Sequence, residues 1–184
     1  YESGRGSALK SRLDQLLLPL VKLRGVASNL APYWFWLVRC EYWEGSRAGA
    51  LRGIEVLREE RDSSWVRSAD MYAVLLALDD KDVAGAEAIY RRLDSPEKAS
   101  VPMNLYLLGR LAMARGEWKE SLQYMVQIVA LHGRNREWLA PAIFAEAELY
   151  QRLGSSDLVL QVVRELEWTF PESEWVAKGR ELLN

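Results

Sequence analysis

The sequence predicts an all-α fold made of repeated pairs of antiparallel helices, and three observations support this prediction. Apolar residues recur at three- and four-residue spacing along most of the chain, as in Leu105, Leu108 and Leu111. No stretch alternates apolar and polar residues for long enough to indicate a strand. Three separate columns of residues also recur along the 184-residue chain with the same steps of 36, 35 and 38 residues, which indicates an internal repeat.

The three repeated columns differ in character. The second is mostly small and the third is entirely aliphatic. Small residues let the two helices of a pair approach closely, and one pair cannot bury its apolar face alone, so consecutive pairs are expected to stack as a solenoid. An ordinary helical bundle is the alternative. The columns are Trp34, Asp70, Leu105 and Ile143; Ala50, Ala86, Ser121 and Val159; and Leu57, Leu93, Ile128 and Leu166.

The periodic stretches and the breaks between them place the elements. We expect helices at residues 7–24, 31–44, 47–60, 65–79, 82–94, 101–115, 117–132, 137–153, 156–169 and 173–183. Turn glycines separate the helices of three pairs, because glycine readily adopts the left-handed conformation that ends a helix. These glycines are Gly45, Gly116 and Gly154. Ser46, and Ser155 or Ser156, follow two of these turns and are expected to cap the next helix.

The pairs resemble the tetratricopeptide repeat (TPR), a helix-turn-helix unit of about 34 residues. The third pair is the most similar, with residues that match the family's Trp or Leu, Leu-Gly, Gly-Asp-Tyr and Ala positions. These residues are Leu105, Leu108-Gly109, Gly116-Glu117-Trp118 and Ser121. The second pair has Lys81 where the family has its turn glycine, and the fourth has Glu146 where the family usually has a buried leucine.

The resemblance implies a right-handed superhelical solenoid of about ten helices. Its four repeats would span about 31–64, 67–100, 102–135 and 140–173, with a capping helix at 174–184. In that cap, Trp175, Val176, Leu182 and Leu183 are expected to cover the fourth repeat, while Glu174, Lys178 and Arg180 face water. Residues 1–28 form a further segment that precedes the repeats.

The N-terminal segment 1–28 is predicted to form a basic amphipathic helix. Five cationic residues outnumber the two acidic residues of this segment, Glu2 and Asp14. Five leucines share one face of the predicted helix. We expect this face to pack on the first repeat, and contact with a membrane surface is the alternative. The cations are Arg5, Lys10, Arg12, Lys22 and Arg24.

Composition and charge argue against several classes of function. Lys and Arg total 24 and Asp and Glu total 26, which argues against nucleic-acid binding. A single histidine, His132, and a single cysteine, Cys40, leave no pair for a metal site and no second candidate for a catalytic triad. No phosphate loop or dinucleotide fingerprint is present. We therefore expect no enzymatic activity, no metal and no cofactor.

Localisation is left open by the sequence. The longest apolar runs, 16–21 and 31–38, are shorter than the roughly 20 residues that span a bilayer, so no integral membrane segment is expected. The chain opens with Tyr1 rather than Met, which leaves open that it is a fragment. The string 169–173 is similar to repeat ends in bacterial envelope proteins. A soluble domain in either the cytoplasm or the periplasm fits these observations.

An excess of aromatic rings suggests a binding surface. Six large rings crowd residues 31–44, more than one buried face of a single helix can hide. In the TPR family, defined positions on the first helix of each pair face a concave groove. The resemblance places there Phe35, Arg39, Tyr42, Trp43, Met71, Leu75, Leu78, Met103, Tyr106, Arg110, Met113 and Phe144.

Such a groove suits an extended or helical segment of a partner protein that carries apolar anchors. Arg39 and Arg110 are expected to pair with acidic side chains of this partner. A carboxylate clamp like that of chaperone adaptors is not expected, because only Arg39 is cationic among the corresponding positions. Two alternatives stay open: the N-terminal helix covers the groove, or the chain is an assembly subunit that self-associates into a homo-oligomer through the same surfaces.

Overall fold

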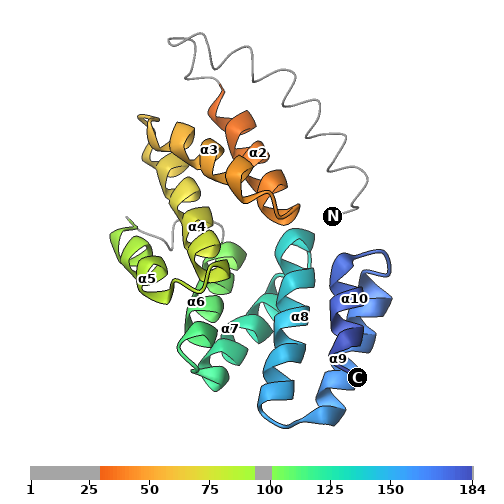
Figure 1. Ribbon diagram of the computed structural model, residues 1–184. Helices are drawn as coiled ribbons and strands as arrows, with labels where there is room; N and C mark the ends of the chain where they lie inside the picture. Colours follow the sequence, from red (N-terminus) through yellow and green to blue (C-terminus); the bar gives the residue numbers. More distant parts are fainter. Residues whose placement is uncertain (1–29, 94–100, 184) are drawn as a thin grey trace. The chain divides into compact units, whose positions relative to one another are not determined.

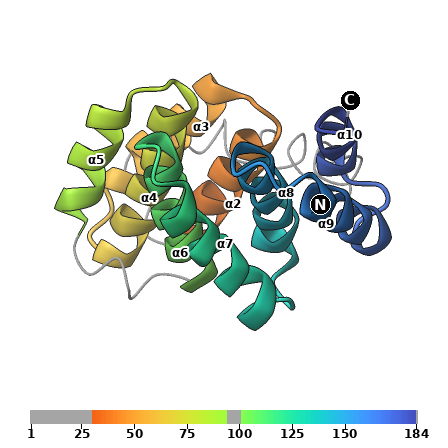
Figure 2. The same ribbon diagram turned by 90° about the horizontal axis from the view of Figure 1, so that it is seen from below.

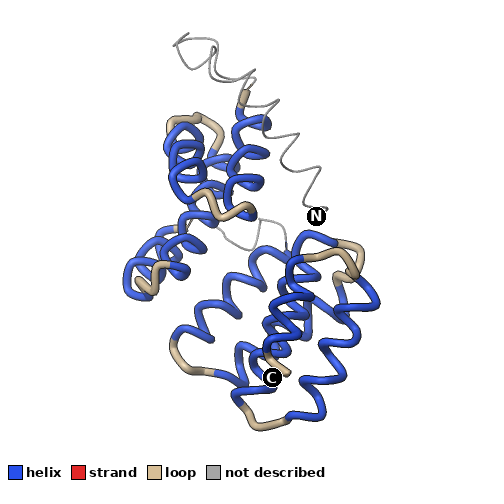
Figure 3. Tube along the Cα trace, turned by 45° about the vertical axis from the view of Figure 1, so that its right-hand side comes forward, coloured by secondary structure: helices blue, strands red, loops and turns tan. Residues whose placement is uncertain are grey.

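The computed structural model describes residues 30–93 and 101–183, and all regular structure within these ranges is helical (Figure 3). Nine helices and no strand lie in the described ranges, so the all-α prediction is confirmed for them. The predicted helix at 7–24 lies outside the described residues. The chain forms two compact units, one holding the described residues 30–93 and the other 101–183.

The first unit contains four helices joined by short turns (Figure 1). Each helix packs against the next one along the chain, and α2 also contacts α4. These contacts make two helical pairs, α2 with α3 and α4 with α5. The helices are α2 (Ala31–Trp43), α3 (Arg47–Arg58), α4 (Ser63–Asp79) and α5 (Val83–Arg92).

The second unit contains five helices, with α8 at its centre. α8 contacts α6, α7, α9 and α10, and Figure 2 shows it between α7 and α9. α6 pairs with α7 and α8 pairs with α9, while α10 packs on both helices of the last pair. The helices are α6 (Val101–Ala114), α7 (Trp118–Leu131), α8 (Arg136–Arg152), α9 (Ser156–Thr169) and α10 (Glu174–Glu181).

The same turn joins the two helices of every pair. One residue in each turn has a positive φ: 74° at Gly45, 63° at Lys81, 78° at Gly116 and 77° at Gly154. These positions follow one another at the steps of the predicted repeat. The next amide then donates to the carbonyl five residues earlier, as from Asp82 to Ala77 at 2.9 Å and from Ser155 to Tyr150 at 2.9 Å. Lys81 therefore replaces the turn glycine without changing the turn.

The helix N-termini are capped differently from the prediction. Ser46 and Ser155 stand at the N-cap positions of α3 and α9, but neither side chain bonds a helix amide. The side-chain caps lie elsewhere. The Asp62 carboxylate accepts from the Ser64 amide at 2.8 Å, that of Asp82 accepts from the Gly85 amide at 2.9 Å, and the Ser173 hydroxyl accepts from the Trp175 amide at 3.3 Å.

The small and the aliphatic columns of the repeat are both buried. The members of the small column, Ala50, Ala86, Ser121 and Val159, are at most 3% exposed. The Ser121 hydroxyl donates to the carbonyl of Gly109 at 2.8 Å, so this one polar member joins α7 to α6. In the first column only Ile143 is buried, because Trp34, Asp70 and Leu105 lie partly exposed.

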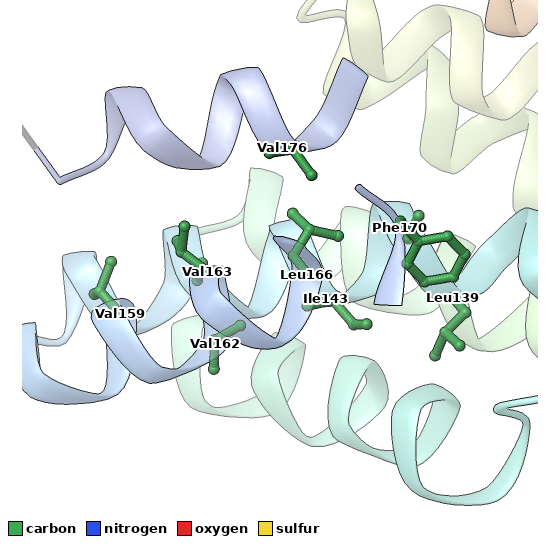
Figure 4. Close-up of a cluster of buried hydrophobic side chains, with 10 residues drawn as sticks. Leu139, Ile143, Val159, Val162, Val163, Leu166, Phe170 and Val176 are labelled. Atoms are coloured by element: carbon green, nitrogen blue, oxygen red, sulfur yellow. The ribbon is translucent and has the colours of Figure 1, made fainter. Parts of the chain in front are cut away.

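The core of the second unit gathers where α8, α9 and α10 meet (Figure 4). Ile143 from α8, Leu166 from α9 and Val176 from α10 are all buried there. Trp175 and Leu182 are partly buried and pack against this cluster, as predicted for the terminal helix. Leu183 is 43% exposed, contrary to prediction, because it lies beyond the end of α10.

The charged side of α10 agrees with the prediction. Glu174, Lys178 and Arg180 are exposed, and Arg180 pairs with Glu167 of α9 at 2.6 Å. Among the helices described, none combines the length and the apolar character needed to cross a membrane.

Candidate functional site

The twelve predicted groove residues divide into a buried half and a partly exposed half. Tyr42, Met71, Leu75, Leu78, Met103 and Tyr106 are buried in the hydrophobic core. Phe35, Arg39 and Trp43 in the first unit, and Arg110, Met113 and Phe144 in the second, keep part of their surface accessible. Only the side chains of the second group have surface that a partner could contact.

Contacts between neighbouring helices explain the burial of the two tyrosines. The Tyr42 ring lies 5.5 Å from that of Tyr72 on α4, and the Tyr106 ring lies 5.3 Å from that of Trp138 on α8. Each tyrosine thus fills the space between the first helices of two successive pairs. The expectation that Tyr106 contacts a ligand is therefore replaced by a role in packing, since only 2% of it is exposed.

The accessible surface of α2 is an aromatic patch, which we define as Tyr33, Phe35, Trp36, Arg39 and Trp43. Tyr33 is 50% exposed and Trp36 is 44% exposed. The guanidinium carbon of Arg39 lies 4.1 Å from the centroid of the Trp36 ring and 5.7 Å from that of Phe35. This spacing is typical of cation–π contacts and holds the charge of Arg39 beside two rings.

Phe35 connects this patch to α4. Its ring lies 5.8 Å from that of Trp65 and 6.0 Å from that of Tyr72. The patch is therefore anchored on packed rings rather than on a mobile loop. Tyr33 and Trp36 were missing from the predicted site, although the excess of rings in this segment could have indicated them.

The second unit presents a different surface, which we call the cationic face. It draws side chains from three helices: Arg110 from α6; Phe144, Glu148 and Arg152 from α8; and Trp175 and Lys178 from α10. The rings of Phe144 and Trp175 lie 5.3 Å apart and join α8 to α10. Phe144, Glu148 and Arg152 recur every four residues, so they form one stripe along α8.

Each cation of this face is held by a neighbouring side chain. Arg110 donates to the Tyr106 hydroxyl at 3.2 Å. The guanidinium carbon of Arg152 lies 4.8 Å from the centroid of the Trp118 ring. The Lys178 ammonium lies 4.1 Å from the centroid of the Trp175 ring and 3.3 Å from a carboxylate oxygen of Glu174.

Glu148 on α8 lies within electrostatic reach of these three cations. Burial raises its pKa, and the nearby charges of Arg110, Arg152 and Lys178 lower it, with burial the larger effect, so that the pKa stays above its usual value. Among the residues that the structure describes, no hydrogen bond or ion pair within 4 Å joins Glu148 to a cation. The three positive charges are therefore close enough to act on Glu148 but make no direct contact with it.

Glu146 lies two residues earlier on α8 in different surroundings. Burial raises its pKa, a hydrogen bond from the Tyr150 hydroxyl lowers it, and the negative charge of Glu165 on α9 raises it. No cation contributes to this balance. The hydrogen bond from Tyr150 gives this partly buried carboxylate a partner.

Exposed apolar side chains also occur singly on α9. Trp168 is 90% exposed, and Leu158 and Leu160 are each 39% exposed. The buried residues of α9, such as Val159 and Leu166, lie on the side of the helix opposite Trp168. The sequence did not single out Trp168, because a lone tryptophan in a helix carries no signal of its exposure.

The single cysteine and the single histidine are not placed in a cluster of reactive side chains within the described residues. Cys40 is buried inside α2, and His132 stands at the C-cap of α7. His132 also lines a recess of about 530 Å³ between the start of α6 and the α7–α8 connection, with Val101, Leu131 and Asn135. In the portion of the chain covered by the structure, no group of three or more histidines, cysteines and carboxylates is placed to hold a metal ion.

Comparison of the chain with protein-family models, with curated proteins and with solved structures finds no match.

Proposed function

We propose that this chain is a non-enzymatic, TPR-like scaffold that binds a protein or peptide partner through the first helices of its helical pairs. One observation carries the proposal. Five of the six partly exposed residues of the predicted groove are aromatic or cationic, with Phe35, Arg39 and Trp43 on one unit and Arg110 and Phe144 on the other. Aromatic and arginine side chains are the usual energetic anchors of protein interfaces.

The repeated turn supports the scaffold part of the proposal. Gly45, Lys81, Gly116 and Gly154 share one backbone conformation at the steps of the sequence repeat. Stacked helix-turn-helix units of this kind present extended surfaces for binding rather than a single enclosed pocket. A continuous groove through both units, and its right-handed superhelical form, stay predictions.

The test is affinity capture by the whole chain from an extract of its native cells, with two matched variants. The double variant Trp36→Ala/Arg39→Ala removes the centre of the aromatic patch. Trp168→Ala removes an exposed ring of the same kind from the outer side of α9. We expect a captured protein to be lost with the double variant and kept with Trp168→Ala. Loss with Trp168→Ala alone would contradict the proposal.

The alternative function is that of an assembly subunit, and the exposure of Trp168 favours it. Trp168 is 90% exposed on α9, and a large aromatic side chain exposed on a helix is a common anchor of protein interfaces. Light scattering after size-exclusion chromatography tests this alternative. A mass that increases with concentration in the wild-type chain, and that falls to one chain in Trp168→Ala, would favour assembly over partner binding.

A further inference from the structure

Trp36, in the aromatic patch of α2, occupies a repeat position that is buried in every later pair. The repeat steps of 36, 35 and 38 residues align it with Tyr72 on α4, Leu107 on α6 and Ala145 on α8. These three residues are at most 3% exposed, whereas Trp36 is 44% exposed. The exposure of Trp36 therefore comes from its place in the first described pair and not from its position within a pair.

Tyr33 lies one helical turn before Trp36 and shows the same difference. Its equivalents Ala69 on α4 and Ala142 on α8 are fully buried, and Asn104 on α6 is partly buried. Tyr33 itself is 50% exposed. Two neighbouring large rings are therefore exposed at positions where the later pairs bury five of the six equivalent side chains.

The contacts of Tyr72 show what covers this position in the second pair. Its ring lies 6.0 Å from that of Phe35 and 5.5 Å from that of Tyr42, and both belong to α2, the first helix of the preceding pair. A helix that precedes α4 in the chain thus covers the side of α4 that corresponds to Trp36. Among the described residues no helix precedes α2, and the same side of α2 is exposed.

Residues 1–29 directly precede α2 and lie outside the described residues. The helix predicted at 7–24 would be about 27 Å long, against about 20 Å for α2, so it is long enough to lie along the whole of α2. Its predicted link to α2, residues 25–30, is close in length to the links at 59–62 and 170–173, which join α3 to α4 and α9 to α10. Short links of this kind keep consecutive helices side by side.

The apolar face of this segment matches the exposed face of α2. Leu30, Trp34 and Leu37 already form an apolar cluster at the start of α2. Tyr33 lies beside them, since residues 30, 33, 34 and 37 follow the spacing of one helix face. Packing of these side chains against leucines would remove apolar surface of both from water. Five leucines share one face of the predicted helix 7–24: Leu9, Leu13, Leu16, Leu17 and Leu20.

We infer that residues 7–24 pack their leucine face on Tyr33 and Trp36, in the place that α2 takes on α4. This contact goes beyond the proposed function and does not depend on it. It has a consequence for that function, because a partner that binds the aromatic patch has to displace the segment. The whole chain then binds such a partner more weakly than a chain in which the patch is free.

The experiment is a disulfide scan in the whole chain. Cys40→Ala removes the single native thiol, and Tyr33→Cys places one thiol on α2. A second cysteine is then placed at each position from 9 to 20 in turn. After mild oxidation, electrophoresis without reductant separates chains with an internal disulfide from crosslinked dimers. Trp168→Cys in place of Tyr33→Cys is the matched control, because Trp168 is an exposed ring outside the aromatic patch.

We expect internal disulfides to position 33 to recur every three or four residues, with the highest yields on the leucine face. A disulfide needs Cα atoms within about 7 Å of each other, and only one face of a packed helix meets this condition. Yields at positions 13, 16, 17 and 20 should therefore exceed those at positions 11 and 15, on the opposite face, severalfold. With Trp168→Cys the yields should be low throughout. Circular dichroism checks that each variant keeps its helices.

Four results would overturn the inference. Equal yields along the scan would show that the segment meets α2 only by chance encounters. The highest yields at positions 11 and 15 would show that the leucine face is not the one in contact. Crosslinked dimers as the main product would show that a second copy covers α2, and the absence of any disulfide would show that the segment lies elsewhere. Each of these results leaves the proposed function to its own capture experiment.

Discussion

Gly53 of α3 faces Val38 of α2 so closely that a Cβ atom on Gly53 would lie 2.5 Å from a methyl carbon of Val38. The second unit contains a counterpart between α6 and α7. A Cβ on Gly109 would lie 2.5 Å from the terminal methyl carbon of Met125. The two sites have the same distance and the same kind of helical pair, but they differ in the stiffness of the neighbour.

We predict that Gly53→Ala destabilises the protein by about 1–3 kcal/mol, because the branched Val38 side chain cannot turn away from the added methyl group. Gly109→Ala should cost clearly less than Gly53→Ala, although its added methyl group would also lie 3.3 Å from the Cβ atom of Tyr124. The flexible end of Met125 can move, and alanine is a better helix former than glycine by about 1 kcal/mol. Urea unfolding followed by circular dichroism gives both free energies of unfolding.

Val38→Ala provides the control for this prediction. In that background the added methyl group of Gly53→Ala meets no branched side chain, so the second substitution should cost much less than in the wild-type chain. Equal costs of Gly53→Ala in the two backgrounds would contradict the assigned clash.

The turn at Lys81 allows a stabilising substitution. Lys81 has a φ of 63°, a conformation that costs an ordinary residue roughly 1–2 kcal/mol relative to glycine. Part of this gain in stability is offset, because glycine loses more conformational entropy on folding than lysine does. We predict that Lys81→Gly stabilises the protein by about 0.5–1 kcal/mol in the same unfolding measurement.

Gly154→Ala is the reciprocal control. Gly154 has a φ of 77°, and a Cβ built there meets no atom within 4 Å, so this substitution tests the backbone conformation without a steric clash. It should destabilise by about 1 kcal/mol. If Lys81→Gly and Gly154→Ala change the stability in the same direction, the left-handed turn is not the cause.

Glu146 gives a prediction about pH. Because burial raises the pKa of Glu146 above its usual value of 4.5, the charged form is less favourable in the folded chain than in the unfolded chain. This penalty is fully present above the folded pKa and disappears as pH falls through that pKa to below 4.5, where the carboxyl is neutral in both states. Glu146→Gln should therefore stabilise the protein at pH 7, and the gain should shrink towards pH 4.

Urea unfolding of both chains at a series of pH values measures this gain. Glu165→Gln should give a smaller gain with the same pH dependence, because the charge of Glu165 adds to the cost of ionising Glu146. A stabilisation by Glu146→Gln that grows as pH falls would show that the sign of the pKa shift is wrong.

The helices and turns could be predicted because their signals are local. Apolar spacing placed every described helix to within two residues at each end, and the turn glycines marked three of the four left-handed residues. Lys81 could be placed only through the repeat, since lysine has no preference of its own for that conformation. The serine caps were predicted incorrectly, because a residue type at the N-cap does not determine its rotamer.

The site was less predictable because exposure depends on contacts between helices. Tyr106 and Arg110 lie one turn apart on the same face of α6, and the family positions treat them alike. Trp138, distant in sequence, covers Tyr106 and leaves Arg110 partly accessible. The charges that act on Glu148 come from three helices, so its electrostatic surroundings arise only when these helices pack together.

Site-specific photo-crosslinking tests most directly whether the first helices carry the binding surface. Benzoylphenylalanine is placed at position 36 in one form of the chain and at position 168 in another, since both tryptophans are exposed and lie on different helices. We predict that, after irradiation in the native extract, a distinct protein is crosslinked at position 36 and not at position 168. Crosslinking at position 168 alone, whether to another protein or to a second copy of this chain, would contradict the proposed function.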